Sequence, residues 1–326
     1  MIDRISVYET FDVNPYENLA TEKYLLDRVR PGQCILYLWQ NQNTVVIGKN
    51  QNPWVECRTT LLQEEGGLLA RRLSGGGAVF HDVGNLNFTF LVSQEDYDLD
   101  KQLAVIQRAC AFAGICAEKS GRNDLLAEGQ KFSGNAFYQA SGKAYHHGTL
   151  LIDVDMGKLS RYLSPPKAKL EAKGISSVRS RVVNLSQLSP ELTCDTMRTF
   201  MKTAFAEVYG LEPEKLTIPN RDSIQALAEE YSSWEYVYGT PLPFTFQCEQ
   251  KFSWGYVLIQ LEVKNGVVLG AKVFSDAMDW NLPAQAEQAL TNCRFTLPDL
   301  QQALSERLSD KSAAQDLCIF LAQQAI

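Results

Sequence analysis

The sequence RRLSGGGAVFHDVGNLNFTF, residues 71–90, joins two arginines to three consecutive glycines and then to an apolar strand. Glycines let backbone N–H groups approach a ligand closely, and a guanidinium can hold a phosphate or carboxylate through two hydrogen bonds. The pattern therefore predicts an anion-binding loop with Arg72 as its cation, although a tight turn with solvated arginines is an alternative. The loop is neither a Walker A loop nor a dinucleotide fingerprint, because Phe80 replaces the third glycine of that fingerprint.

Short apolar runs and helical periodicities alternate on both sides of this loop, which predicts a mixed α/β (α+β) fold. Downstream, two extended stretches at residues 131–139 and 144–154 are expected to pair as a hairpin. Upstream, we expect another hairpin from residues 35–39 and 44–47, followed by a helix over residues 61–70.

The polar stretch at residues 211–243 contains four prolines, which predicts a linker and a domain boundary near residue 243. Residues 1–243 would then form the domain that carries the glycine-rich loop. Residues 244–326 would form a small α/β domain, with a hairpin of residues 252–263 and 267–274 around Asn265 and Gly266, and helices near residues 284–292 and 298–324.

Composition excludes several classes of protein. The 326 residues include 31 Lys and Arg against 38 Asp and Glu, a net charge of −7, which argues against a general nucleic-acid binder. The sequence has neither a long apolar membrane span nor a signal peptide, so we expect a cytoplasmic protein without a membrane partner. Its eight cysteines lack metal-ligand spacing, which predicts reduced thiols and no structural zinc site.

Two further segments carry side chains that suit a binding cleft. Lys131 and Ser133 are two residues apart in a predicted strand, so both would point into one cleft, unless the lysine is simply solvated. His146 and His147 are adjacent in the next predicted strand and therefore face opposite ways. At most one of them can line a given cleft, a metal held by both is not expected, and His146 is expected to be a packed histidine.

Together these motifs resemble the lipoate-protein ligases. RRLSGGGAVFHDVGNLNFTF is followed in the same order by GRNDL, KFSGNA, HHGTLLIDVD and KGISSVRSRVVNL, and the resemblance extends from about residue 18 to residue 239. It implies a biotin/lipoate ligase-like catalytic domain with a largely antiparallel mixed sheet, plus a C-terminal accessory domain. Two departures are the short segment between Asp124 and Lys131, and Asn135 in a place where small hydroxyl residues are common.

The resemblance also implies an activity. Such enzymes activate lipoate with ATP and Mg²⁺, release pyrophosphate, keep lipoyl-AMP bound and pass the lipoyl group to a lysine of a lipoyl domain. The acceptors would be the E2 subunits of 2-oxoacid dehydrogenases and the glycine cleavage H protein. Lys131 would be the catalytic residue, contacting the acyl carbonyl oxygen and the α-phosphate, and Asp124 would lie near the metal. The implied substrate-binding and ATP-binding residues are Arg72, Ser74, Gly76, Gly77, Ala78, Val79, Phe80, His81, Asn85, Asn123, Asp124, Ser133, Gly134, His147, Gly148 and Thr149.

A fixed ammonium at residue 131 suits both chemical steps. Adenylation brings two anionic reactants together, and acyl transfer develops an oxyanion on the same carbonyl, so one cation can stabilise both transition states. The acceptor lysine of the partner must lose a proton before it attacks. His147 or Asp124 could accept that proton, and the sequence does not choose between them.

Positive charge gathers between residues 157 and 184, where seven Lys and Arg face a single carboxylate, that of Glu171. We call this stretch the basic segment. A solvated surface is the simplest interpretation of such a run. The resemblance places the basic segment where the family has a nucleotide-covering loop, so we hypothesise that it closes over the adenylate and helps to dock an acidic lipoyl domain.

Other functions remain open. An ATP-independent lipoyltransferase could use preformed lipoyl-AMP or a carrier-bound acyl group, but a thioester route needs a cysteine near the glycine-rich loop, Lys131 or His147, and none is there. A biotin ligase is disfavoured by the pattern of the loop. A non-catalytic lipoate-binding protein, from another class, is disfavoured because Arg72, the glycines and Lys131 are all present. We expect a monomer.

Overall fold

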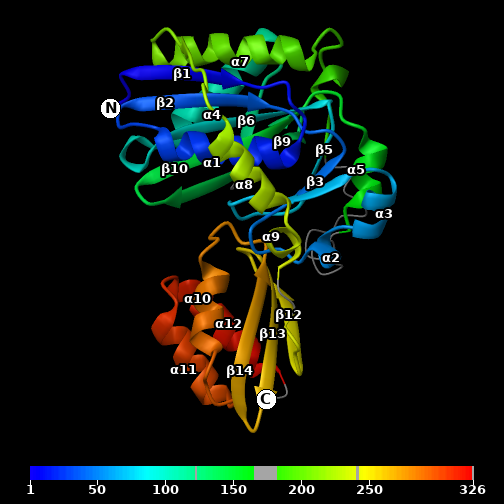
Figure 1. Cartoon of the computed structure of the whole chain (residues 1–326), viewed down its shortest axis with the longest axis vertical. Coiled ribbons are helices and arrows are strands. Elements are labelled where there is room, and N and C mark those ends of the chain that lie inside the picture. The colour runs from blue at the N-terminus through cyan, green and yellow to red at the C-terminus, as the bar shows by residue number, and fades with distance from the viewer. Residues whose placement is uncertain (122, 165–181, 240–241, 325–326) are drawn as a thin grey trace.

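The computed structural model describes residues 1–121, 123–164, 182–239 and 242–324. Figure 1 shows two parts, a larger one that contains the N-terminus and a smaller C-terminal one that extends from it. Most of the basic segment, including Lys167 and Lys169, lies outside the described residues. Among the residues that the structure does describe, no helix is long and apolar enough to span a bilayer.

The larger part is built on an eight-stranded mixed sheet. Its β1–β2 and β1–β11 pairs are parallel and the other neighbouring strands are antiparallel, which confirms the predicted α+β class with a largely antiparallel sheet. In spatial order the strands are β11 (Glu214–Lys215), β1 (Arg4–Glu9), β2 (Gln33–Trp39), β6 (Asn85–Ser93), β10 (Lys143–Leu151), β9 (Gln130–Ala140), β8 (Asp124–Ala127) and β7 (Glu118–Ser120).

Helices cover both faces of this sheet, with α1 and α8 in front of it in Figure 1 and α4 behind. The helical elements of the larger part are α1 (Pro15–Arg28), α2 (Pro53–Glu56), α3 (Thr59–Glu64), η1 (Gln94–Asp96), α4 (Leu99–Phe112), α5 (Met156–Tyr162), η3 (Leu185–Gln187), α7 (Cys194–Tyr209), α8 (Asp222–Ser232) and α9 (Trp234–Tyr238).

Because both faces are covered, every residue of β2 and β6 is buried. Alternate side chains of β2 separate onto the two faces. Leu36 and Leu38 pack in the hydrophobic cluster that includes α4 and α7, whereas Tyr37 and Trp39 pack in the cluster that includes α1. Trp39, at the end of β2, therefore lies on the α1 face of the sheet.

The predicted hairpin of residues 35–39 and 44–47 is wrong. β3 (Thr44–Ile47) leaves the large sheet and pairs with β4 (Leu68–Arg71) and β5 (Val79–His81) in a separate three-stranded sheet. The connection is not a solvated turn, because Asn41 is buried between the side chains of Asn18 and His81. Buried hydrogen bonds of Asn41 thus fix the connection between the two sheets.

The other two local predictions near the loop are confirmed to different degrees. The helix predicted over residues 61–70 exists only as α3, because Gly66, at φ 71°, follows its end and residues from Leu68 onward form β4. The hairpin of β9 and β10 is confirmed. Its turn residues Ser141 and Gly142 have φ of 52° and 71°, the left-handed conformation that tight hairpin turns require.

The polar stretch at residues 211–243 is not a linker over most of its length, contrary to the sequence prediction. It forms β11, α8 and α9, and Ile224 and Tyr231 of α8 share a hydrophobic cluster with Leu25 of α1. Its charged residues are exposed, and Pro213 and Pro219 lie in the connections on either side of β11. The linker was predicted from amino-acid composition alone, which does not reveal the apolar face of α8.

The C-terminal part has its own hydrophobic cluster, formed between a three-stranded sheet and helices. The hairpin predicted around Asn265 and Gly266 is confirmed as β13–β14. The helix predicted over residues 298–324 is two helices, because the side chain of Asp310 accepts backbone hydrogen bonds at the start of the second one. The elements are β12 (Phe246–Lys251), β13 (Tyr256–Lys264), β14 (Val267–Ser275), α10 (Leu282–Leu290), α11 (Leu297–Arg307) and α12 (Lys311–Ala322).

The end of β14 and the segment that follows it contact the larger part beside the glycine-rich loop. Ser275 N donates to Asn50 O at 2.9 Å, Asn50 Nδ2 donates to Trp280 O at 2.7 Å, and the Trp280 ring stacks on Tyr138 with centroids 5.1 Å apart. A Cβ added to Gly75 would lie 2.3 Å from the carbonyl oxygen of Ala277. The backbones of the two parts are therefore in direct contact at this point.

The close packing of the β5–β6 turn gives a test of the fold. A Cβ on Gly84 would lie 2.0 Å from Asp153 O, a backbone atom that cannot swing away. We expect Gly84→Ala to lower the free energy of unfolding by about 1–3 kcal/mol, the usual cost of overpacking. Chemical denaturation measures it, with Gly157→Ala as the control, because a Cβ there meets only the end of the Asp155 side chain. Equal midpoints for the two variants would contradict the packing described.

Candidate active site

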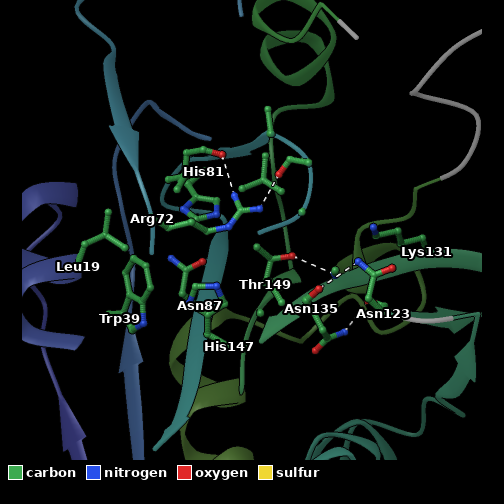
Figure 2. Close-up of a pocket in the computed structure, with 18 residues that line it drawn as sticks. Leu19, Trp39, Arg72, His81, Asn87, Asn123, Lys131, Asn135, His147 and Thr149 are labelled. Carbon is green, nitrogen blue, oxygen red and sulfur yellow. Dashed lines mark hydrogen bonds between the residues drawn. The ribbon is translucent and has the colours of Figure 1, made fainter. Parts of the chain in front are cut away.

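A pocket lies between the large sheet and the small sheet, beneath the glycine-rich loop, as Figure 2 shows. Its cavity volume is about 130 Å³, and it is open to solvent. The predicted site residues on its wall are Arg72, Gly76, Gly77, Ala78, Val79, His81, Asn123, Lys131, Gly134, His147, Gly148 and Thr149. The wall residues that were not predicted from the sequence are Leu19, Trp39, Val46, Asn87, Asn135 and Ala136.

Five predicted residues do not line this pocket: Ser74, Phe80, Asn85, Asp124 and Ser133. Phe80 lies between two wall residues of β5 and therefore faces the other way, where its ring packs 5.5 Å from that of Tyr162. Asn85 is buried and donates to the side chain of Asn87, which reaches the pocket in its place.

A β-bulge separates Ser133 from Lys131. Leu125 pairs with Ser133 while the next residue of β8, Leu126, pairs with Lys131, so Phe132 is an extra residue on β9. The expected shared face of Lys131 and Ser133 is therefore lost, and Ser133 is fully buried. The bulge leaves the Lys131 side chain over Gly134, where a Cβ would lie 2.9 Å from its Nζ.

The missed wall residues differ in the signals that they give. Three of them are apolar residues whose local sequence is the same for a pocket wall as for a hydrophobic core: Leu19, Trp39 and Val46. Asn87 and Asn135 are amides within apolar strands, and a buried polar residue of that kind is an informative signal.

The guanidinium of Arg72 holds the glycine-rich loop from within. Its Nη2 donates to Gly75 O at 2.7 Å and to Gly77 O at 2.8 Å, its Nη1 donates to Val46 O, and its Nε donates to Ser74 Oγ. Burial lowers its pKa to about 10, so it stays charged at neutral pH. In this structure Arg72 binds carbonyls of the loop, whereas the sequence predicted a bidentate contact with a ligand.

The glycines of the loop differ in how much space surrounds them. Gly76 has φ of 89°, a conformation that L side chains rarely adopt. Gly48 must also lack a side chain, because its Cβ would lie 2.3 Å from Gly76 O. At Gly77, by contrast, a Cβ would meet no atom within 4 Å. Gly77 therefore faces the open space of the pocket.

Lys131 is paired in this structure. Its Nζ lies 2.7 Å from Asp124 Oδ1, and both side chains are partly exposed, at 30% and 23%. Thr149 Oγ1 accepts a hydrogen bond from the backbone N–H of Gly134, directly below the lysine. An ammonium is thereby held at the edge of the pocket beside backbone and hydroxyl groups (Figure 2).

His147 belongs to a buried polar network. Its Nδ1 lies 2.8 Å from Glu22 Oε1 and its Nε2 lies 2.8 Å from Ser74 Oγ. Thr89 also donates to Glu22, and the indole N–H of Trp39 donates to Thr89. Both ring nitrogens of His147 are therefore engaged. His146, on the opposite face, is fully buried as predicted.

His81 presents a neutral N–H donor at the wall. The Asn41 amide oxygen accepts from Asn18 Nδ2, so its nitrogen donates to His81 Nδ1, and the ring proton must sit on Nε2. Burial and the nearby charge of Arg72 lower the His81 pKa to about 3, which keeps the ring neutral. Neither His81 Nε2 nor Asn87 Nδ2 has a hydrogen-bond partner in the described part of the chain. A bound ligand or water would satisfy these two donors.

Comparison with known families identifies the architecture around this pocket. Residues 14–206 match the family described as "Lipoyl protein ligase A/B catalytic domain", and residues 242–315 match "Bacterial lipoate protein ligase C-terminus". The chain belongs to the lipoate-protein ligase family. A lipoate-protein ligase A of Psychrobacter cryohalolentis is 36% identical over 96% of this chain and 96% of its own length. One of Bdellovibrio bacteriovorus is 41% identical, over 85% of this chain and 84% of its own length. This lipoate-protein ligase is accordingly an enzyme.

Solved structures of lipoate-protein ligases share its fold. P. falciparum LipL1, in complex with lipoate, has a TM-score of 0.85 and 27% identity, covering 98% of this chain and 99% of its own. A lipoate-protein ligase A bound with ATP has a TM-score of 0.63 and 26% identity, covering 73% of this chain and 99% of its own. A bipartite ligase of Thermoplasma acidophilum, described with its E2 lipoyl domain, has a TM-score of 0.62 and 26% identity, covering 76% of this chain and 100% of its own.

Gly77 offers a test of ligand approach at the loop. Because a Cβ there meets no protein atom, we expect Gly77→Ala to leave the melting temperature unchanged. The added methyl group would stand in the space where a ligand approaches the backbone, so we expect weaker substrate binding, by about tenfold or more in KM for ATP or lipoate. Steady-state kinetics beside a thermal melt measure both quantities. Unchanged kinetics would mean that no substrate passes close to Gly77.

Proposed function

We propose that this chain activates lipoate with ATP to form lipoyl-AMP and then transfers the lipoyl group to a lysine of a lipoyl domain. The observation that carries the proposal is the position of Lys131, whose ammonium lies on the wall of the same pocket as the glycine-rich loop. The relatives support it, since one solved member of the family is described with lipoate and another with ATP.

The two ends of the pocket differ in chemistry, which supports an acyl-adenylate as its occupant. Leu19, Trp39 and Val46 line one end, and in Figure 2 Leu19 and Trp39 lie on the side away from Lys131. An alkyl chain is stabilised by such a wall through burial of apolar surface. The reacting carboxylate would then lie at the opposite end, near Lys131 and Thr149.

Lys131 would act on charge in both steps. As the carboxylate attacks the α-phosphorus, negative charge accumulates on the phosphoryl oxygens, and the ammonium stabilises it. In the second step the same ammonium would stabilise the oxyanion that develops on the acyl carbonyl. Its partner Asp124 holds the side chain at the pocket edge, and phosphate oxygens would compete with that carboxylate for the ammonium.

Mg²⁺ fits this site as a companion of ATP. No group of three or more His, Cys, Asp or Glu in the described ranges could hold a metal ion. Asp124, a partly exposed carboxylate beside the site, suits a Mg²⁺ held mainly by phosphates, which is the usual mode of binding in nucleotide sites. The ion would neutralise phosphate charge, and Asp124 would be its protein ligand.

The structure also bears on the proton acceptor for the attacking lysine of the partner. Both ring nitrogens of His147 are engaged, with Glu22 and Ser74, and the ring lies inside the pocket. Asp124 borders the open edge, where its side chain is 23% exposed. Because only Asp124 is reached from the open edge, we favour it over His147 as the group that receives the proton in the transfer step, after pyrophosphate has left with its Mg²⁺.

The rival functions are less well supported. No cysteine is among the described residues that line the pocket, so a thioester route has no nucleophile there. A transferase that uses preformed lipoyl-AMP would keep the same pocket and is separated only by experiment. A non-catalytic lipoate-binding protein would not need an ammonium at residue 131.

The finer points of the function are also proposals. Acceptors would be E2 lipoyl domains and the glycine cleavage H protein, supported by the T. acidophilum relative that is described with its E2 lipoyl domain. The division at residue 243 is supported by the separate family matches, which end at residue 206 and begin at residue 242. A monomeric state and a cytoplasmic location stay predictions.

One reaction tests the proposed function. Purified protein is incubated with an apo lipoyl domain, lipoate, Mg²⁺ and ATP, and the acceptor is weighed by mass spectrometry. We expect a lipoyl mass increase that disappears when ATP or lipoate is omitted. Modification by lipoyl-AMP but never by ATP and lipoate would select the transferase, and no modification under either condition would select a binding protein.

Lys131→Ala tests the catalytic role. Removal of a group that stabilises developing charge costs about 10²–10³ in rate, so we expect pyrophosphate exchange to fall by at least that factor while the melting temperature is kept. Lys119→Ala is the matched control, because Lys119 is a surface lysine whose ammonium is also ion-paired, to Asp100. Near wild-type exchange in Lys131→Ala would remove this residue from the mechanism.

A further inference from the structure

A line of buried polar side chains runs from α4 to the edge of the pocket, behind the wall already described. His146 of β10 is fully buried, its Nε2 lies 2.7 Å from Asn135 Oδ1, and its Nδ1 lies 3.2 Å from the amide of Gln102. Asn135 of β9 lines the pocket and contacts Asn123 at the far end of this line. The proposed reaction uses neither His146 nor Asn135.

The directions of these hydrogen bonds follow from the chemistry of each group. Asn135 Nδ2 donates to Asn123 O at 3.0 Å, so its Oδ1 is the atom that accepts from His146. Burial lowers the pKa of His146 to about 3, so the ring carries one proton, on Nε2. Nδ1 must then accept. Gln102 Oε1 faces Nδ1, and Gln102 Nε2 has no hydrogen-bond partner within the described residues. Rotation of the Gln102 amide by half a turn exchanges these two atoms, so that Nε2 donates to His146 Nδ1.

Asn135 holds Asn123 at three points. Its backbone N–H donates to Asn123 O at 2.8 Å, its side-chain amide donates to the same oxygen at 3.0 Å, and Asn123 Nδ2 donates back to Asn135 O at 3.0 Å. Asn123 directly precedes Asp124, which is paired with Lys131. The side chain of Asn135 therefore adds one hydrogen bond to the main-chain contacts that place Asn123, and with it the carboxylate beside the catalytic lysine.

The surroundings show that this amide has space made for it. A Cβ on Gly148 would lie 2.8 Å from Asn135 Oδ1, so the glycine on the neighbouring strand leaves room for the side chain. The rings of Phe88, Phe90 and Phe137 surround His146, with centroids 5.2–5.9 Å away. In this apolar setting the only polar contacts described for the imidazole are those of its two nitrogens, with Gln102 and Asn135.

We propose that Asn135, oriented by His146, is the positioning residue that sets the nucleotide side of the site by fixing Asn123 and Asp124. This inference rests on the proposed function, because it assigns the edge of the pocket near Asn123 and Asp124 to ATP and the Leu19–Trp39 end to the acyl chain. A purely structural role is the alternative. Loss of a structural contact would lower stability and affect both substrates together, whereas a positioning role affects ATP alone.

Three variants separate these roles. Asn135→Leu removes the amide, His146→Phe removes the donor while keeping an aromatic ring, and His146→Gln keeps an N–H that can reach Asn135 Oδ1. The control is Gln107→Leu, which deletes another amide on α4 that bonds a backbone carbonyl, that of Ala117. The readouts are KM for ATP and kcat in pyrophosphate exchange, the Kd for lipoate by calorimetry without ATP, and the melting temperature.

We expect Asn135→Leu and His146→Phe to raise KM for ATP about tenfold, the effect of one lost hydrogen bond, with the Kd for lipoate changed less than twofold. His146→Gln and Gln107→Leu should stay close to the wild type. Equal shifts in both constants, no shift in either, or a His146→Gln variant as impaired as His146→Phe would overturn the positioning role. Absence of exchange in the wild type would remove the proposed function and this role together, whereas normal exchange in Asn135→Leu would remove this role alone.

Discussion

The buried guanidinium of Arg72 is the interaction on which the site depends. It joins the small sheet, through Val46 O, to the carbonyls of Gly75 and Gly77, and it contacts Ser74. A cation in this position is costly to bury, and its burial is compensated because several oxygen acceptors surround it. Without the guanidinium, the carbonyls of Gly75 and Gly77 would lose their shared donor, and the loop would lose the contacts that fix its backbone conformation.

From Arg72 the same network continues to the large sheet. Ser74 reaches His147 of β10, His147 reaches Glu22 of α1, and Thr89 of β6 and Trp39 of β2 complete the chain. Helix, loop and two sheets thus meet through side chains that satisfy each other. Fully satisfied buried networks of this kind favour one arrangement over others, because each alternative leaves a polar group unpaired. The pocket is accordingly a property of the fold and needs no ligand to define its wall.

The sequence predicted those parts of the site that rest on local patterns. The glycine-rich loop, the lysine at residue 131 and the β9–β10 hairpin are each encoded within a few residues. Contacts between distant segments were not predictable, since Glu22 and His147 are 125 positions apart and Glu22 lies outside every motif. The bulge at Phe132 and the departure of β3 into a second sheet were also missed, because both are decided by partners elsewhere in the fold. Arg72 was recognised as important, but its local sequence says nothing of the direction in which its donors point.

The hydrogen bonds described between the two parts of the molecule use backbone atoms on the C-terminal side, and the Trp280 ring adds a side-chain contact with Tyr138. Ser275 contributes its N–H, and Ala277 and Trp280 contribute their carbonyl oxygens, to partners around Asn50 and Gly76. Backbone groups are the same in every amino acid except proline, which lacks the N–H. Apart from the Trp280 ring, side chains from Ser275 to Trp280 can therefore change while these hydrogen bonds to the larger part are kept. Accessory domains with different sequences can then make the same backbone hydrogen bonds to the region around Asn50 and Gly76.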